Sequence, residues 1–127
     1  MTSRLALMLA AVAMFVAVAL GAFGAHWLRG RLDPTMIAVW QTAVQYHAWH
    51  ALALLGVGIL LLQWPDKRGL RLAAWLFLAG IVLFAGSLYA LALTGVGALG
   101  AITPAGGLAF LAGWLVLAWT AWRHTKS

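Results

Sequence analysis

The sequence has no cysteine and very little charge. Of its 127 residues only two are Asp or Glu and eight are Lys or Arg, whereas 65% are hydrophobic. Soluble domains are about one quarter charged, so charge this sparse cannot cover a surface that faces water. The absence of cysteine excludes disulfides, thiolate metal sites and cysteine nucleophiles. We therefore expect an integral membrane protein whose main partner is the lipid bilayer.

The residue patterns typical of catalytic sites are also missing. No carboxylate lies within an apolar run, and no serine lies in a nucleophile elbow. No glycine-rich loop joins a strand to a helix, so nucleotide binding has no basis. The net charge of +6 lies between apolar segments rather than on one soluble face, which argues against nucleic acid. We expect a protein that is not an enzyme, and the sequence requires no cofactor.

Four segments are long and apolar enough to cross a membrane, which takes about 20 residues of helix. They do not alternate apolar and polar residues, so a β-barrel is excluded. The first also has the short basic start of a signal peptide, but its apolar run is longer than a signal core. We expect an all-α integral membrane protein, a compact antiparallel four-helix bundle forming a single domain over 1–127, with spans at 5–25, 37–62, 72–94 and 105–122.

The basic residues predict how the bundle is oriented. Six lie at the chain ends and in the second connection: Arg4, Lys67, Arg68, Arg71, Arg123 and Lys126. Only two, Arg29 and Arg31, lie in the first connection, and the third connection has none. Because Lys and Arg are retained on the cytoplasmic side, both termini are expected there, in a multi-pass protein of the bacterial inner membrane. Tryptophans near both boundaries, with Trp27 and Trp40 at the outer one, fit the aromatic belts of membrane proteins.

Small residues recur every fourth position in three of the expected helices. Such spacing lets helix backbones approach closely, within one chain or between chains. The residues expected to pack in this way are Ala13, Ala17, Gly21, Ala25, Gly86, Ala90, Ala105, Ala109 and Gly113.

Polar side chains of the expected spans gather in their outer half. The stretch "QYHAWH" at 45–50 places His47 and His50 on one stripe of a helix, three positions apart. Polar groups in hydrocarbon are costly unless paired, and they often mark function. The candidate ligand-binding or relay residues are His26, Gln45, Tyr46, His47, His50, Ser87, Tyr89 and Thr103.

Several interpretations of these residues stay open. His47 and His50 are either neutral imidazoles that hold helices together, or ligands of a metal, haem or small molecule, with His26 as the third metal ligand. A proton relay through His47, His50 and Tyr89 is a further interpretation. Tyr46, Tyr89 and Trp49 also suit interfacial anchors. Ser87 and Thr94 commonly return their hydroxyls to the helix backbone.

Four stretches, taken together, resemble a known family. They are "GAFGAH" at 21–26, "WQTAVQYHAWHALALL" at 40–55, "GSLYALALTG" at 86–95 and "GAITPAGGLAFLAGW" at 100–114. In this order they are similar to the YgdD-type small inner-membrane proteins, a family related to a transmembrane protein group of animal mitochondria. The resemblance implies a four-helix membrane protein of unknown function and supplies no substrate or active site. The family pattern includes His26, Trp40, Gln45, Tyr46, His47, His50, Ser87, Tyr89, Thr103, Pro104 and Gly107.

The sequence favours transport or binding of a small molecule or ion through an outer polar cluster of His26, His47, His50 and Tyr89, with the protein acting as an oligomer. One alternative is an accessory or assembly subunit of a larger membrane complex, which needs no chemistry of its own. Another is a metal- or haem-binding membrane protein.

Overall fold

The computed structural model describes residues 1–125, and these residues are helical apart from short connections. Lys126, one of the basic residues counted above, lies outside the described residues. The elements are α1 (Ser3–Phe23), η1 (Gly24–Leu28, a π-helical turn), α2 (Pro34–Gln63), α3 (Arg68–Gly80), η2 (Ile81–Ala85, a second π-helical turn), α4 (Gly86–Thr94), η3 (Gly97–Ala101, a 3₁₀ helix) and α5 (Thr103–Thr125).

These elements join into four helical segments long and apolar enough to cross a membrane: Ser3–Leu28, Pro34–Gln63, Arg68–Thr94 and Gly97–His124. Each contains one of the spans expected from the sequence. α1 and α2 begin slightly earlier than expected, and a side chain caps each of them. The Thr2 hydroxyl accepts a hydrogen bond from the Leu5 amide, and an Asp33 carboxylate oxygen accepts one from the Met36 amide at 2.8 Å. Capping satisfies amides that have no partner within the helix.

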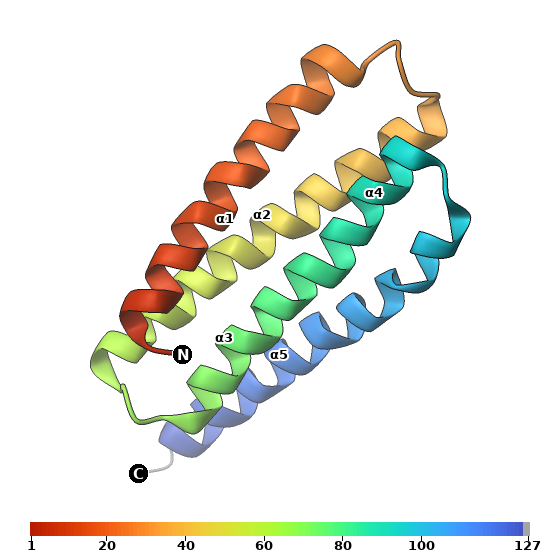
Figure 1. The fold of residues 1–127 in the computed structure, drawn as a ribbon. Coiled ribbons are helices and arrows are strands. Elements are labelled where there is room, and N and C mark those ends of the chain that lie inside the picture. The colour runs from red at the N-terminus through yellow and green to blue at the C-terminus, as the bar shows by residue number, and fades with distance from the viewer. Residues whose placement is uncertain (126–127) are drawn as a thin grey trace.

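The connections are short, so consecutive segments are antiparallel neighbours (Figure 1). Gly30 in the first connection and Gly95 after α4 have positive φ angles of 87° and 71°, which glycine adopts without steric cost. In the α2–α3 turn the Arg71 guanidinium donates to the Pro65 carbonyl at 2.7 and 3.0 Å. Both described ends of the chain lie at the same end of the molecule as this turn (Figure 1).

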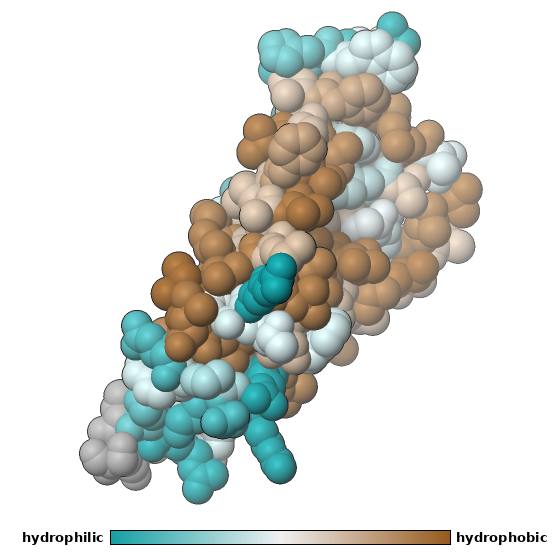
Figure 2. All heavy atoms as spheres, turned by 60° about the vertical axis from the view of Figure 1, so that its left-hand side comes forward, coloured by the Kyte–Doolittle hydropathy of each residue, from teal (hydrophilic) through white to brown (hydrophobic). Residues whose placement is uncertain are grey.

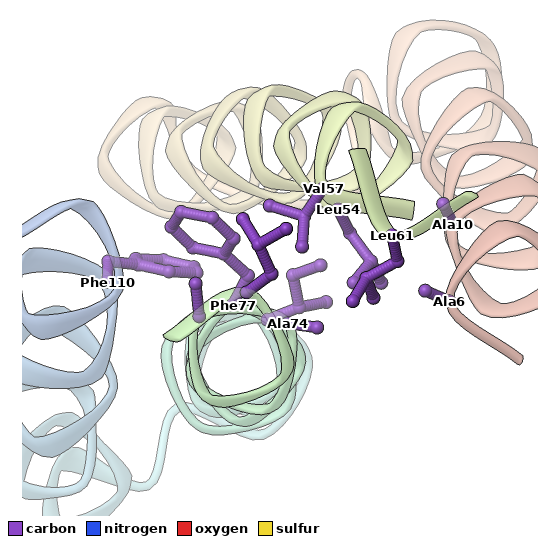
Figure 3. Close-up of a cluster of buried hydrophobic side chains, with 11 residues drawn as sticks. Ala6, Ala10, Leu54, Val57, Leu61, Ala74, Phe77 and Phe110 are labelled. Carbon is purple, nitrogen blue, oxygen red and sulfur yellow. The ribbon is translucent and has the colours of Figure 1, made fainter. Parts of the chain in front are cut away.

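The all-α architecture of four antiparallel segments expected from the sequence is confirmed, and the segments are arranged as an open row. α1 packs along α2, α2 packs against α3 and α4, and α5 packs along α3 and η2. α1 and α5 lie at opposite ends of the row, and neither packs along the other (Figures 1 and 3). Of an 18-residue apolar stretch in each end segment, only 17% of the residues are buried, against 39% in each middle segment. The large side chains of α1, such as Phe15, point outward, and the buried residues of α1 are alanines that face α2.

The core lies where α2 meets α3, with α1 and α5 adding residues from either side (Figure 3). Its largest fully buried side chains are Phe77, Leu54, Leu61 and Val57. On the face shown in Figure 2, hydrophobic side chains cover most of the middle and hydrophilic ones gather at the two ends. This distribution matches a bilayer with polar boundaries.

The expected small-residue stripes coincide only partly with the helix contacts. Ala17 and Gly113 are buried, and Ala13, Gly21, Ala90 and Ala109 are partly buried, whereas Ala25, Gly86 and Ala105 are exposed. α5 instead approaches η2 closely at Gly106, where an added Cβ would lie 2.7 Å from the Phe84 Cα. The contact face of α5 therefore starts one residue later than the stripe predicts.

Candidate functional site

The two histidines of α2 lie on either side of its midpoint, His47 just within the half that the sequence predicts and His50 just beyond it. His47 and His50 follow Pro34 by 13 and 16 residues in a helix of 30 residues. At a rise of 1.5 Å per residue, they lie about 20 and 24 Å along a helix about 45 Å long. Both side chains are buried, with exposed fractions of 4% and 5%. Imidazoles at this depth need partners from the protein itself.

His47 finds its partners between α1, α2 and α4. Its Nδ1 lies 2.9 Å from the Tyr89 hydroxyl of α4, and the Ala13 backbone of α1 lies near the same ring. The Tyr89 ring packs on Trp40 at 4.7 Å between centroids. The Trp40 indole donates to the Leu20 carbonyl at 2.9 Å. Trp40 is only 3% exposed, so it holds three helices together and is not the interfacial anchor expected from the sequence.

His50 turns to the other side of α2, and its partners determine its tautomer. Its Nδ1 lies 2.7 Å from the Tyr46 carbonyl, which can only accept a hydrogen bond. Its Nε2 lies 3.1 Å from the Trp114 indole nitrogen of α5, which can only donate. His50 is therefore a neutral imidazole that carries its proton on Nδ1. The ring also stacks on Phe110 at 3.5 Å between centroids.

The hydroxyl groups near the α4–α5 connection form a third, separate set. The Ser87 hydroxyl donates to the Phe84 carbonyl at 3.0 Å and lies 2.6 Å from the Thr103 hydroxyl. Phe84 lies in the π-helical turn η2, where the regular helical hydrogen bonds are displaced. Thr94 donates to the Ala90 carbonyl at 2.6 Å. Both Ser87 and Thr94 thus return their hydroxyls to the backbone, and Ser87 also connects α4 to the start of α5.

The residues expected to form one cluster are therefore distributed over several sites. His26 is exposed in η1, and Gln45 is exposed on α2. Within residues 1–125, no three His, Asp or Glu side chains lie close enough together to hold a metal ion. His26, His47 and His50 do not form the metal set that the sequence suggested. The Nε2 atom of His50, which would ligate a metal or haem, already accepts a hydrogen bond from the Trp114 indole.

An open groove lies beside His50, between α2 and α5. This α2–α5 groove has a volume of about 680 Å³, and its walls include Tyr46, Trp49 and His50 from α2 and Phe110 and Trp114 from α5. Its lining is mostly aromatic and aliphatic. The Tyr46 ring packs on Trp49 and Phe84, with centroids 5.1 and 4.7 Å away. The Tyr46 hydroxyl makes no hydrogen bond within residues 1–125, whereas the Tyr89 hydroxyl is paired with His47.

Sequence reasoning identified Tyr46 and the histidines but missed Trp114, Phe110 and Phe84. These residues lie far from α2 in the chain, and Trp114 is 64 positions from His50. An indole in an apolar span needs an acceptor. That requirement signals a partner without saying which of the polar groups it is.

Comparison with known proteins is consistent with this architecture. A family model described as "Protein of unknown function (DUF423)" matches residues 20–107. The UPF0382 membrane protein YwdK of Bacillus subtilis is 47% identical over 111 residues, covering 87% of this chain and 90% of the relative. The UPF0382 inner membrane protein YgdD of Escherichia coli is 42% identical over 123 residues, covering 92% and 88%. The resemblance to YgdD-type proteins is confirmed. No solved structure matches the chain.

Proposed function

Because the chain belongs to the DUF423 family of unknown function and is a multi-pass protein of the bacterial inner membrane, we propose that it binds a hydrophobic small molecule of the bilayer in the α2–α5 groove. The role is binding without catalysis. The groove volume of about 680 Å³ falls within the range of small-molecule sites, roughly 300–1,000 Å³. Its side opening would admit a ligand from the surrounding lipid.

The observation that carries this proposal is the uncommitted Tyr46 hydroxyl in an otherwise apolar groove. Tyr46 follows Pro34 by 12 residues, so it lies about 18 Å along α2, well inside the span. The hydrocarbon core of the bilayer contains no water that could hydrogen-bond this hydroxyl. A ligand with a carbonyl or hydroxyl group would satisfy it, while aromatic walls contact the ligand's apolar body. The expected ligand is therefore lipophilic and has one hydrogen-bonding head.

Ion conduction fits the same residues less well. A conducting path presents a continuous series of polar groups to the ion. His47 is engaged with Tyr89, His50 with Trp114, and Ser87 with Thr103. These pairs lie in three different helix interfaces, α2–α4, α2–α5 and α4–α5.

The test is native mass spectrometry of the full chain from mild detergent, comparing wild type with Tyr46→Phe. Tyr89→Phe is a matched control, because the chain has two tyrosines and Tyr89 hydrogen-bonds His47 instead of lining the groove. We expect an added mass on wild type and on Tyr89→Phe. Its occupancy should fall about tenfold in Tyr46→Phe, as expected when a ligand loses a buried hydrogen bond. The proposal would be contradicted if wild type carried no added mass. It would also be contradicted if wild type, Tyr46→Phe and Tyr89→Phe all carried the added mass equally.

A second candidate function, an accessory subunit, is favoured by a different observation. The end helices α1 and α5 leave most of their surface uncovered, including Phe15 at 75% exposed. A neighbouring membrane protein that packs there would shield these faces. The test is native electrophoresis of membranes from wild-type and Phe15→Ala cells. A discrete larger assembly that contains a second protein and is lost in the variant would support it, and a wild-type chain that migrates alone would oppose it.

A further inference from the structure

A second groove lies on the other side of α2, between α2 and α1, and shares no residue with the α2–α5 groove. This α1–α2 groove has a volume of about 340 Å³. Gly21 and Gly24 of the first segment and Val44 of α2 contribute apolar walls, and Arg29 also lines the groove. Gln41 and Gln45 also line it. Arg29 belongs to the α1–α2 connection. This connection lies at the end of the molecule opposite the chain termini (Figure 1).

Three polar side chains of this groove have no partner in the described part of the chain. Gln41 and Gln45 are exposed, and neither amide makes a hydrogen bond within residues 1–125. The Arg29 guanidinium is also exposed and forms no ion pair there. The nearest carboxylate in sequence, Asp33, is engaged in capping α2. The other, Asp66, pairs with Arg71 in the α2–α3 turn. The groove therefore presents a positive charge and two amides without a complementary group.

The depths of these three side chains match successive parts of a phospholipid. α2 has 30 residues and is about 45 Å long, as thick as a bilayer with its headgroups, about 40–45 Å. Arg29, which precedes α2, would then lie at headgroup depth. Measured along α2 from Pro34, Gln41 lies about 10 Å and Gln45 about 16 Å into the span. The amides thus lie at and below the level where the ester carbonyls join the acyl chains.

From this arrangement we propose that the α1–α2 groove binds an anionic phospholipid. Arg29 binds the phosphate, which an arginine can contact with two hydrogen bonds. The Gln41 amide donates to an ester carbonyl, and one acyl chain lies against Gly21 and Val44. This proposal is independent of the function proposed for the α2–α5 groove.

Charge decides between a lipid and a second copy of the chain in this groove. A two-fold related copy would bring its own Arg29 toward the same groove, because symmetric interfaces repeat one patch on both partners. The same connection carries Arg31, whose guanidinium lies 3.9 Å above the Trp27 ring. Like charges would then face one another at the boundary. An anionic headgroup provides the opposite charge.

The experiment measures phospholipid binding to the full chain by native mass spectrometry after delipidation in detergent. The probes are phosphatidylglycerol, phosphatidylcholine and diacylglycerol with the same acyl chains. Arg29→Gln removes the proposed phosphate contact. Arg31→Gln is the matched control, because it removes the same charge from the same exposed connection but does not line the groove. Ala25→Phe, at an exposed small residue of the groove wall, fills the groove without touching the core.

We expect wild type and Arg31→Gln to bind phosphatidylglycerol in preference to the other two lipids. Arg29→Gln should bind it about tenfold more weakly, as expected for one lost hydrogen bond to a charged group. Ala25→Phe should also lose phosphatidylglycerol binding. Three results would overturn the proposal: equal binding by Arg29→Gln and wild type, diacylglycerol bound as well as phosphatidylglycerol, or a lipid-free dimer that Ala25→Phe dissociates.

Discussion

At the scale of single residues, the sequence indicates which polar groups must be paired but not with what. His47 and His50 were expected to act together because they are three positions apart. Three residues correspond to a rotation of about 300°, so the two side chains still differ in direction by about 60°. α2 has helices on both sides, and this difference sends His47 toward Tyr89 and His50 toward Trp114. These partners are 42 and 64 positions away, beyond the reach of any local pattern.

The tautomer of His50 is a residue-scale prediction. Because the Tyr46 carbonyl accepts from Nδ1 and the Trp114 indole donates to Nε2, the imidazole should carry its proton on Nδ1. ¹⁵N NMR of histidine-labelled protein in detergent should show a protonated Nδ1 and a hydrogen-bonded, unprotonated Nε2 for His50. Trp114→Phe should shift the Nε2 resonance. Trp119→Phe, at an exposed position of α5, should leave it unchanged. A proton on Nε2 would disprove the assignment.

At the scale of elements, the sequence predicts the four helical segments but not the faces by which they pack. Their apolar residues lie on every side, because lipid and protein core select the same side chains. With 14 glycines in the chain, small residues occur at helical spacing on several faces. The π-helical turn η2 also rotates α4 relative to a regular helix, so its contact face does not follow from a period of 3.6. Gly86 was expected to pack, yet an added Cβ there meets open space.

The contact between α5 and η2 gives an element-scale prediction based on two adjacent glycines. At Gly106 an added Cβ would lie 2.7 Å from the Phe84 Cα, and this backbone atom cannot move aside. At Gly107 the nearest atom, in the Phe84 ring, is 3.8 Å away, an ordinary contact. Gly106→Ala should therefore reduce the free energy of unfolding by about 1–3 kcal/mol, the usual cost of overpacking. Gly107→Ala should be neutral or slightly stabilising, because alanine favours a helix.

Reversible unfolding in mixed detergent, followed by circular dichroism, would compare these two variants directly. Equal stability of Gly106→Ala and Gly107→Ala would mean that α5 does not approach η2 as closely as the structure places it.

At the scale of the whole molecule, orientation in the membrane stays a prediction from the basic residues. The absence of cysteine makes it directly testable, since any introduced thiol is unique. Gly97→Cys lies in the third connection and Asp66→Cys in the α2–α3 turn, and both positions are exposed. A membrane-impermeant maleimide should label Gly97→Cys in intact cells and Asp66→Cys only after permeabilisation. The reverse pattern would invert the proposed topology.

The open row is a property of the whole molecule that no single segment reveals. The sequence does not distinguish an apolar face that packs on another helix from one that contacts lipid. Both kinds of face carry the same apolar side chains. A closed bundle would bring α1 against α5, whereas the row separates them. Phe15 of α1 and Leu115 of α5 are 75% and 72% exposed at its two ends. A short cross-linker should therefore not join Phe15→Cys to Leu115→Cys within one chain.

The same double variant separates a closed bundle from an assembly of rows. In denaturing electrophoresis, an internal cross-link leaves a monomer of altered mobility, and a link between chains gives a dimer. Leu7→Cys/Gly58→Cys is the positive control, since an added Cβ at Gly58 lies 2.9 Å from the Leu7 side chain. An internal link between positions 15 and 115 would disprove the open row. Dimers would instead show that at least one of the uncovered end faces of the row meets another copy of the chain.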